Sequence, residues 1–218
     1  MTTNNLLWVL DYLKERFNGD FYISDAVKKE LIDKPLASKK FKFEALQVSF
    51  RVKKAVLNIV ETPQIKALAE ELQGLANKTF KVKGNWLKIV HYAEMETLAA
   101  AIILNASAVV IDERTTKLLV ENPQELTKMF GRMLRAKVFV NKKNLEKIHQ
   151  WVKSIKILRS VELVLIAYEK GILNKYLLEE KDARKTLVES LLWGVKLHGC
   201  AISRREIDEL VALETAGK

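Results

Sequence analysis

The stretch AEMETLAAAIILNASAVVID, residues 93–112, limits the possible folds of this chain more than any other. It opens with an acid, Glu94, continues as an alanine-rich helical segment, and ends in a β-branched run that closes on a second acid, Asp112. Because a helix rises about 1.5 Å per residue and a strand more than about 3 Å, a short strand can return to the level where the helix began. Both acids are therefore expected at one edge of a parallel sheet, where α/β proteins bind ligands.

Short strands alternate with helices through the first two thirds of the chain. The predicted strands are residues 21–23, 57–60, 107–111 and 138–140. Since helical segments separate them, parallel pairing through right-handed crossovers is the simplest topology. We therefore expect an α/β fold with a small central parallel sheet between helices.

From Asn141 onward the apolar residues recur at helical spacing, and Ser203 with Glu206 has the pattern of a capping box. We predict one domain over residues 1–150 and a helical extension over residues 151–218. This extension is interpreted either as helices that complete a core or as an element for binding nucleic acid or forming a homodimer.

Composition narrows the class of protein. The 218 residues carry a net charge of +10, which favours a polyanionic partner such as RNA, or else only keeps a lysine-rich surface soluble. A single cysteine, Cys200, excludes a disulfide framework and predicts a reducing, cytoplasmic location. No apolar run has membrane-spanning length, so no membrane association is expected. The sequence motifs of P-loop, dinucleotide-binding and serine hydrolase enzymes do not occur.

Two segments together resemble the PIN-domain family of VapC-like metal-dependent nucleases. They are FYISDAVKKELID, residues 21–33, and AEMETLAAAIILNASAVVIDERTTKLL, residues 93–119. The resemblance covers most of residues 4–140 and favours the branch with a GEAEAL-type motif, in which the third acid is a glutamate. It implies a PIN-like three-layer fold and hydrolysis of RNA with Mg²⁺ or Mn²⁺. It also implies a possible role as the toxin of a toxin–antitoxin pair, with a small antitoxin protein as partner.

Carried over residue by residue, the acidic site of the family falls on Glu30, Glu94 and Asp112. These three are expected to be catalytic and to bind the metal directly or through water. Carboxylate oxygens are ligands that Mg²⁺ prefers, and a metal-activated water can attack a phosphodiester. Four residues soon after Asp112 are expected either to contact RNA phosphate or to form a solvated loop: Arg114, Thr115, Thr116 and Lys117.

The part of the chain that resembles the family does not include the family's first strand, which carries its first aspartate. Residues 1–17 match the loop and helix that follow that strand. One expectation is that the natural chain begins upstream of Met1 and is an active ribonuclease. The other is that this member has lost the strand, leaving a catalytically impaired RNA-binding or scaffold protein. Asp11 is expected to be a solvated helix charge and a poor substitute.

Several other residues have competing interpretations. Glu96 is expected at the surface or in support of the site. Glu113 is expected to cap a helix or to pair with Arg114, and Asp25 is expected to cap a helix. Trp86 either stacks on a base or anchors a core. Basic runs that can contact RNA phosphates are Lys39, Lys40 and Lys42; Arg51, Lys53 and Lys54; Lys78, Lys81 and Lys83; and Arg132, Arg135 and Lys137.

Overall fold

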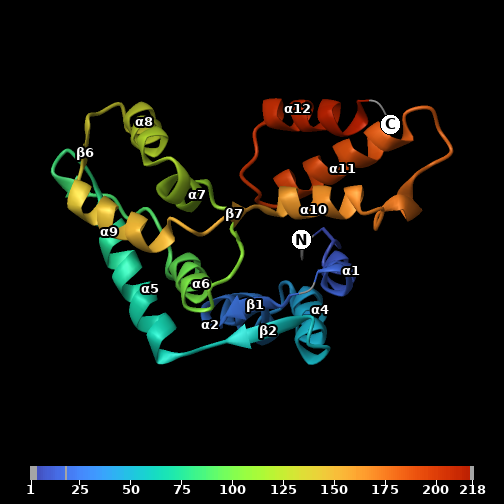
Figure 1. Cartoon of the computed structure of the whole chain (residues 1–218), viewed down its shortest axis with the longest axis horizontal. Coiled ribbons are helices and arrows are strands. Elements are labelled where there is room, and N and C mark those ends of the chain that lie inside the picture. The colour runs from blue at the N-terminus through green and yellow to red at the C-terminus, as the bar shows by residue number, and fades with distance from the viewer. Residues whose placement is uncertain (1–3, 18, 217–218) are drawn as a thin grey trace. The chain divides into compact units, whose positions relative to one another are not determined.

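The computed structural model describes residues 4–17 and 19–216 and alternates helices with short strands (Figure 1). The mixed α/β class expected from the sequence is confirmed. The chain divides into two compact units. Unit 1 comprises Met1–Phe21, Leu31–Asn58 and Leu158–Lys218, and unit 2 comprises Tyr22–Glu30 and Ile59–Ile157. This division does not coincide with the predicted boundary at residue 150, which lies inside a helix.

Unit 2 holds most of the short strands. Its elements, some of which begin or end just outside it, are β1 (Phe21–Ser24), α2 (Asp25–Lys28), β2 (Leu57–Val60), α5 (Pro63–Ala76), β3 (Phe80–Val82), β4 (Asn85–Trp86), α6 (Tyr92–Ile103), β5 (Val109–Val110), α7 (Arg114–Glu121), α8 (Pro123–Leu134), β6 (Val138–Val140), α9 (Lys142–Val152) and β7 (Ile157–Leu158). After α2 the chain continues as a π-helical turn, η1 (Lys29–Asp33).

Unit 1 is helical. Its elements are α1 (Val9–Arg16), α3 (Lys34–Ala37), α4 (Lys42–Lys53), α10 (Ser160–Glu169), the 3₁₀ turn η2 (Asn174–Tyr176), α11 (Ala183–Leu197) and α12 (Arg204–Thr215). Helix α10 packs against α1 and α11, and α11 packs against α12. Asp11 on α1 is not a purely solvated charge, because its Oδ2 lies 3.0 Å from Nη2 of the buried Arg51. That expectation is corrected by a contact between residues far apart in the chain.

Within the described residues, the strands form three small sheets in place of the expected central one. Strand β1 pairs with β2, β5 pairs with β7, and the third sheet has the order β4–β3–β6. The predicted strands at 57–60 and 138–140 are present at those residues. However, β6 pairs antiparallel with β3, which itself forms an antiparallel hairpin with β4, so this sheet is not part of a parallel one.

The β3–β4 hairpin was not predicted from the sequence. Its two turn residues, Lys83 and Gly84, have φ values of 48° and 86°. Positive φ at both central positions is what a type I′ turn requires, and this turn matches the twist of the strands it joins. The sequence pattern typical of such a hairpin is Asn-Gly or Asp-Gly, and here lysine occupies the first of these positions.

Three helix starts are fixed by side-chain caps, and the one at Ser203 confirms the predicted capping box. The Thr62 hydroxyl accepts a hydrogen bond from Ile65 N at 3.2 Å and caps α5. Asn122 Oδ1 accepts from Glu125 N at 3.0 Å and caps α8. Ser203 caps α12 as half of the expected capping box. Each cap satisfies a backbone N–H that has no partner inside its helix.

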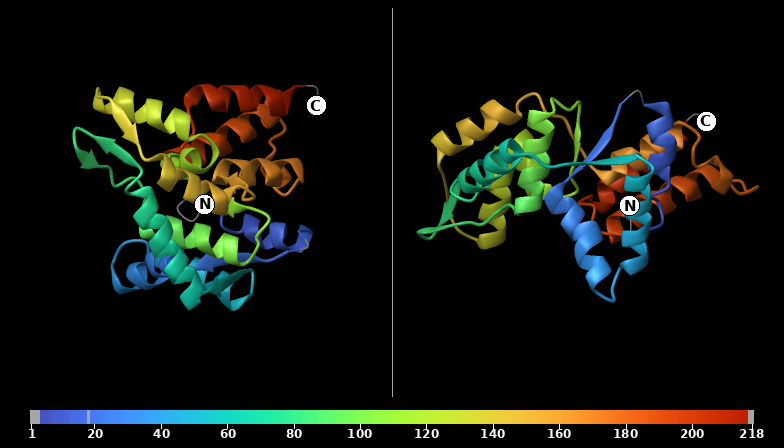
Figure 2. Two further views of the ribbon diagram at one scale, coloured as in Figure 1. Left: turned by 60° about the vertical axis from the view of Figure 1, so that its left-hand side comes forward. Right: turned by 90° about the horizontal axis from the view of Figure 1, so that it is seen from below.

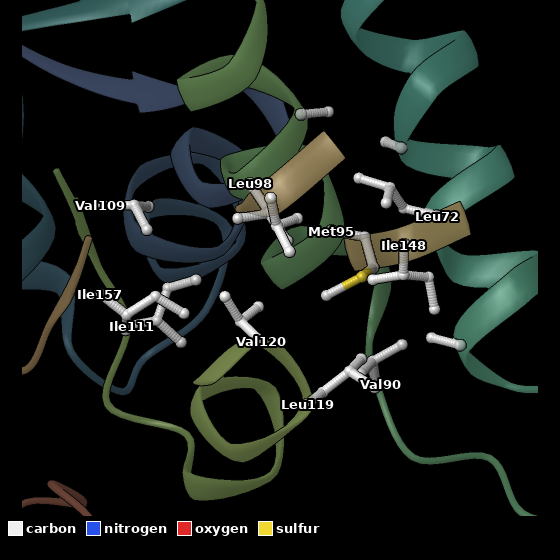
Figure 3. Packing of buried hydrophobic residues seen from close by; sticks show 14 of the residues in the cluster. Leu72, Val90, Met95, Leu98, Val109, Ile111, Leu119, Val120, Ile148 and Ile157 are labelled. Carbon is white, nitrogen blue, oxygen red and sulfur yellow. The ribbon is translucent and has the colours of Figure 1, made fainter. Parts of the chain in front are cut away.

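The core of unit 2 lies between α5, α6, α7 and α9 (Figure 3). Leu72 of α5, Met95 and Leu98 of α6, Leu119 of α7 and Ile148 of α9 are each at most 1% exposed. Burying one such side chain stabilises the fold by about 1.5–3 kcal/mol. Because α6 is enclosed by these contacts, the position of its first turn, which carries Glu94, is determined by the core.

No described helix combines the length and the apolar character that a membrane-spanning segment needs.

Candidate acidic site at the start of helix α6

Glu94 lies in the first turn of α6. One of its carboxylate oxygens, Oε2, is 3.5 Å from the backbone N of His91, the residue that precedes the helix. A negative side chain is favourable at this end, because the unpaired N–H groups of a helix start carry partial positive charge. The carboxylate is thus held near the helix terminus and is partly exposed.

A second contact joins Glu94 to the segment that follows β5. The hydroxyl of the fully buried Thr116 donates a hydrogen bond to Glu94 Oε2 at 2.7 Å. Thr116 belongs to the first turn of α7, which begins two residues after Asp112. Glu94 therefore contacts the first turn of α7, the helix that follows Asp112 in the chain.

The start of α7 is itself built by local contacts. The Glu113 carboxylate accepts a hydrogen bond from Thr115 N at 3.1 Å, which agrees with its expected capping role. Lys117 lies 3.4 Å from Glu121 in an ion pair along the same helix. Of the four residues expected at RNA phosphate, Arg114 is exposed, whereas Thr116 is buried against Glu94 and is not available to a ligand.

Glu30 is placed differently from the other two acids. It is exposed and lies in the π-helical turn η1, a type of irregularity that occurs often at functional sites. Among residues 4–17 and 19–216, no three His, Cys, Asp or Glu side chains are grouped so that they could hold one metal ion. The described residues therefore do not assemble the expected three-acid site of Glu30, Glu94 and Asp112.

Glu96 has a role that the sequence did not reveal. It is 2% exposed, and its Oε2 accepts a hydrogen bond at 2.6 Å from the backbone N of Ala26, at the start of α2. Its Oε1 accepts one from the Tyr92 hydroxyl at 3.2 Å. Burial, together with the charge of Glu96, raises the pKa of the Tyr92 hydroxyl, which favours its protonated, donating form. Glu96 therefore ties α6 to α2.

Asp25 also differs from its prediction as a helix cap. The cap of α2 is Ser24, whose hydroxyl accepts from Val27 N at 3.4 Å. Asp25 is the first residue of the helix, is 6% exposed, and pairs with Lys29 Nζ at 2.6 Å. Its hydrogen bond and its negative charge raise the pKa of Lys29. Two buried carboxylates, Asp25 and Glu96, thus lie at the contact of α2 with α6.

Replacing Glu96 by alanine is expected to lower the free energy of unfolding by about 2–4 kcal/mol, because a buried N–H and a buried hydroxyl lose a charged acceptor. Chemical denaturation measures this change. Glu71→Ala, at an exposed position on α5, is the control and should stay within about 0.5 kcal/mol of the unaltered chain. If both substitutions lower the free energy of unfolding by the same small amount, Glu96 does not hold α2 and α6 together.

In comparisons with known proteins, no protein-family model, curated protein or solved structure matches the chain.

Proposed function

We propose that this chain is a ribonuclease that hydrolyses RNA phosphodiesters with Mg²⁺ or Mn²⁺ bound at Glu94 and Asp112. The observation that carries the proposal is the hydrogen bond from Thr116 to Glu94, since it brings the acid at the start of α6 to the segment that follows Asp112. The resemblance to PIN-domain nucleases in residues 21–33 and 93–119 supports the same site. A net charge of +10 suits a polyanionic substrate.

Two carboxylates are sufficient for such a site in principle, because Mg²⁺ keeps several waters and is often bound by one or two carboxylates together with substrate phosphate. The bound metal would supply an activated water and neutralise charge on the phosphate. Thr116 hydrogen-bonds the Glu94 carboxylate, and the exposed Arg114, two residues after Asp112 in the chain, would contact the substrate phosphate. Without a metal, carboxylates held close together repel each other.

The direct test is incubation of the purified chain with single-stranded RNA, with and without Mn²⁺. Cleavage that requires Mn²⁺ and stops when a chelator is added is the expected result, and calorimetry should detect Mn²⁺ binding under the same conditions. A chain that binds RNA but neither binds Mn²⁺ nor cleaves would contradict the proposal. That result would favour the alternative function, an RNA-binding or scaffold protein with the same fold.

A further inference from the structure

The β4–β3–β6 sheet carries a row of three side chains across its strands. Lys81 on the central strand is paired with Trp86 on one neighbour and with Phe139 on the other. Residues directly opposite each other in antiparallel strands project from the same face of the sheet. Trp86, Lys81 and Phe139 therefore share one face, and strand spacing places the two aromatic residues about 10 Å apart.

This face is open to solvent, whereas Phe80 and Val82 of the central strand are buried on the opposite face. Trp86 is 40% exposed and Phe139 is 60% exposed. On the other face, Phe80 is fully buried and packs edge-on against Phe130 of α8, with ring centroids 5.4 Å apart. Figure 2 shows the β3–β4 hairpin, drawn in teal, projecting beyond the end of α5 in both views. The aromatic row is thus presented on a sheet that the core holds rigidly from behind.

The three strands and the residues beside them in the sequence are rich in basic side chains. The Lys81 ammonium lies 5.2 Å from the centre of the Trp86 ring, in a cation–π contact. Residues 78–88 contain no acid. The basic residues in and beside the three strands are Lys78, Lys81, Lys83, Lys88, Arg135, Lys137, Lys142 and Lys143.

A hollow adjoins the row at Trp86. Its volume is about 380 Å³, within the range of small-ligand sites, and Trp86, Lys78 and Lys88 are among its lining residues. Gln73 and Glu70 of α5 also line it, and they offer oxygens that can accept hydrogen bonds from the amino groups of a base. The hollow therefore combines a ring for stacking, cations for phosphate and acceptors for a base edge.

We infer that this exposed face of the β4–β3–β6 sheet, together with the hollow beside Trp86, binds single-stranded RNA. Flat aromatic rings on an open sheet, alternating with cations, suit unpaired bases that stack while lysines contact the phosphates. Duplex RNA hides its base faces and would not use the rings. The inference extends the proposed function, because it takes RNA as the ligand, but it concerns binding at residues other than the acidic pair.

The test is the affinity of the chain for a fluorescent single-stranded oligoribonucleotide, measured by anisotropy in the presence of a chelator. Trp86→Ala and Phe139→Ala are each expected to weaken binding about 5- to 150-fold, the effect of losing one stacked base. Phe43→Ala, which removes a 69% exposed ring from α4, is the matched control and should leave the affinity unchanged. Lys81→Gln should lower the slope of log affinity against log salt by about 0.7.

Because the chelator removes any metal from the acidic site, this binding assay does not depend on that site, and failure of the acidic site and failure of this surface are distinguishable. Equal affinity of Trp86→Ala, Phe139→Ala and the unaltered chain would overturn the inference. So would equally tight binding of uridine monophosphate, because the site would then serve free nucleotides. Binding of poly-glutamate that is lost in the same two variants would identify an acidic protein as the partner and would also overturn it.

Discussion

The Glu94→Gln and Asp112→Asn variants are each expected to lose at least about 100-fold in Mn²⁺-dependent cleavage of RNA. Removing groups that only support metal ligands costs about 10- to 100-fold, so removal of a ligand itself should cost no less. Both substitutions keep the size of the side chain. Glutamine at position 94 can still accept the hydrogen bond from Thr116, so the charge changes while the contact between α6 and α7 is retained.

The measurement is the initial rate of cleavage of a labelled RNA at saturating Mn²⁺, alongside a thermal melt of each variant. Glu71→Gln, which removes an exposed acid from α5, is the control for the loss of one negative charge and should cleave at the unaltered rate. If Glu94→Gln and Asp112→Asn fold normally and still cleave, the two acids are not the metal ligands, and any nuclease activity belongs elsewhere in the chain.

Replacing Phe80 by alanine is expected to lower the free energy of unfolding by about 3–5 kcal/mol. Phe80 is fully buried and packs against Phe130. Its removal therefore loses the free energy gained by burying the ring away from water, and it also leaves a cavity behind β3. Because Lys81 follows it on the same strand, the variant should also weaken binding of single-stranded RNA by loosening the row formed by Trp86, Lys81 and Phe139.

Denaturant unfolding followed by circular dichroism measures the first effect, and anisotropy measures the second. Phe139→Ala is a matched control for stability, because it removes a ring from the exposed face of the same sheet and should change the free energy of unfolding by no more than about 0.5 kcal/mol. Comparable destabilisation in the two variants would mean that the two faces of the sheet are not divided into core and surface as described.

Part of the candidate site can be compared with its prediction. The spacing of Glu94 and Asp112 along a helix and the following strand predicts that both acids lie at one edge of a sheet, and the hydrogen bond from Thr116 joins Glu94 to the helix that follows Asp112. Glu30 was assigned from the family resemblance alone, and the structure leaves it exposed in a π-helical turn. Glu96 was expected at the surface or in support of the site, whereas it is 2% exposed and binds the start of α2, a neighbour that local spacing does not identify.

By itself, the sequence determined where elements begin and end: strands at 57–60 and 138–140, and helices capped at Thr62, Asn122 and Ser203. These features depend on a few adjacent residues, whose caps and β-branched side chains act locally. Only the tertiary structure decided that Glu96 would bind the start of α2, 70 residues away, and that Phe139 would align with Lys81 and Trp86. Such contacts depend on strand register and on the packing of distant helices, which local periodicity does not encode.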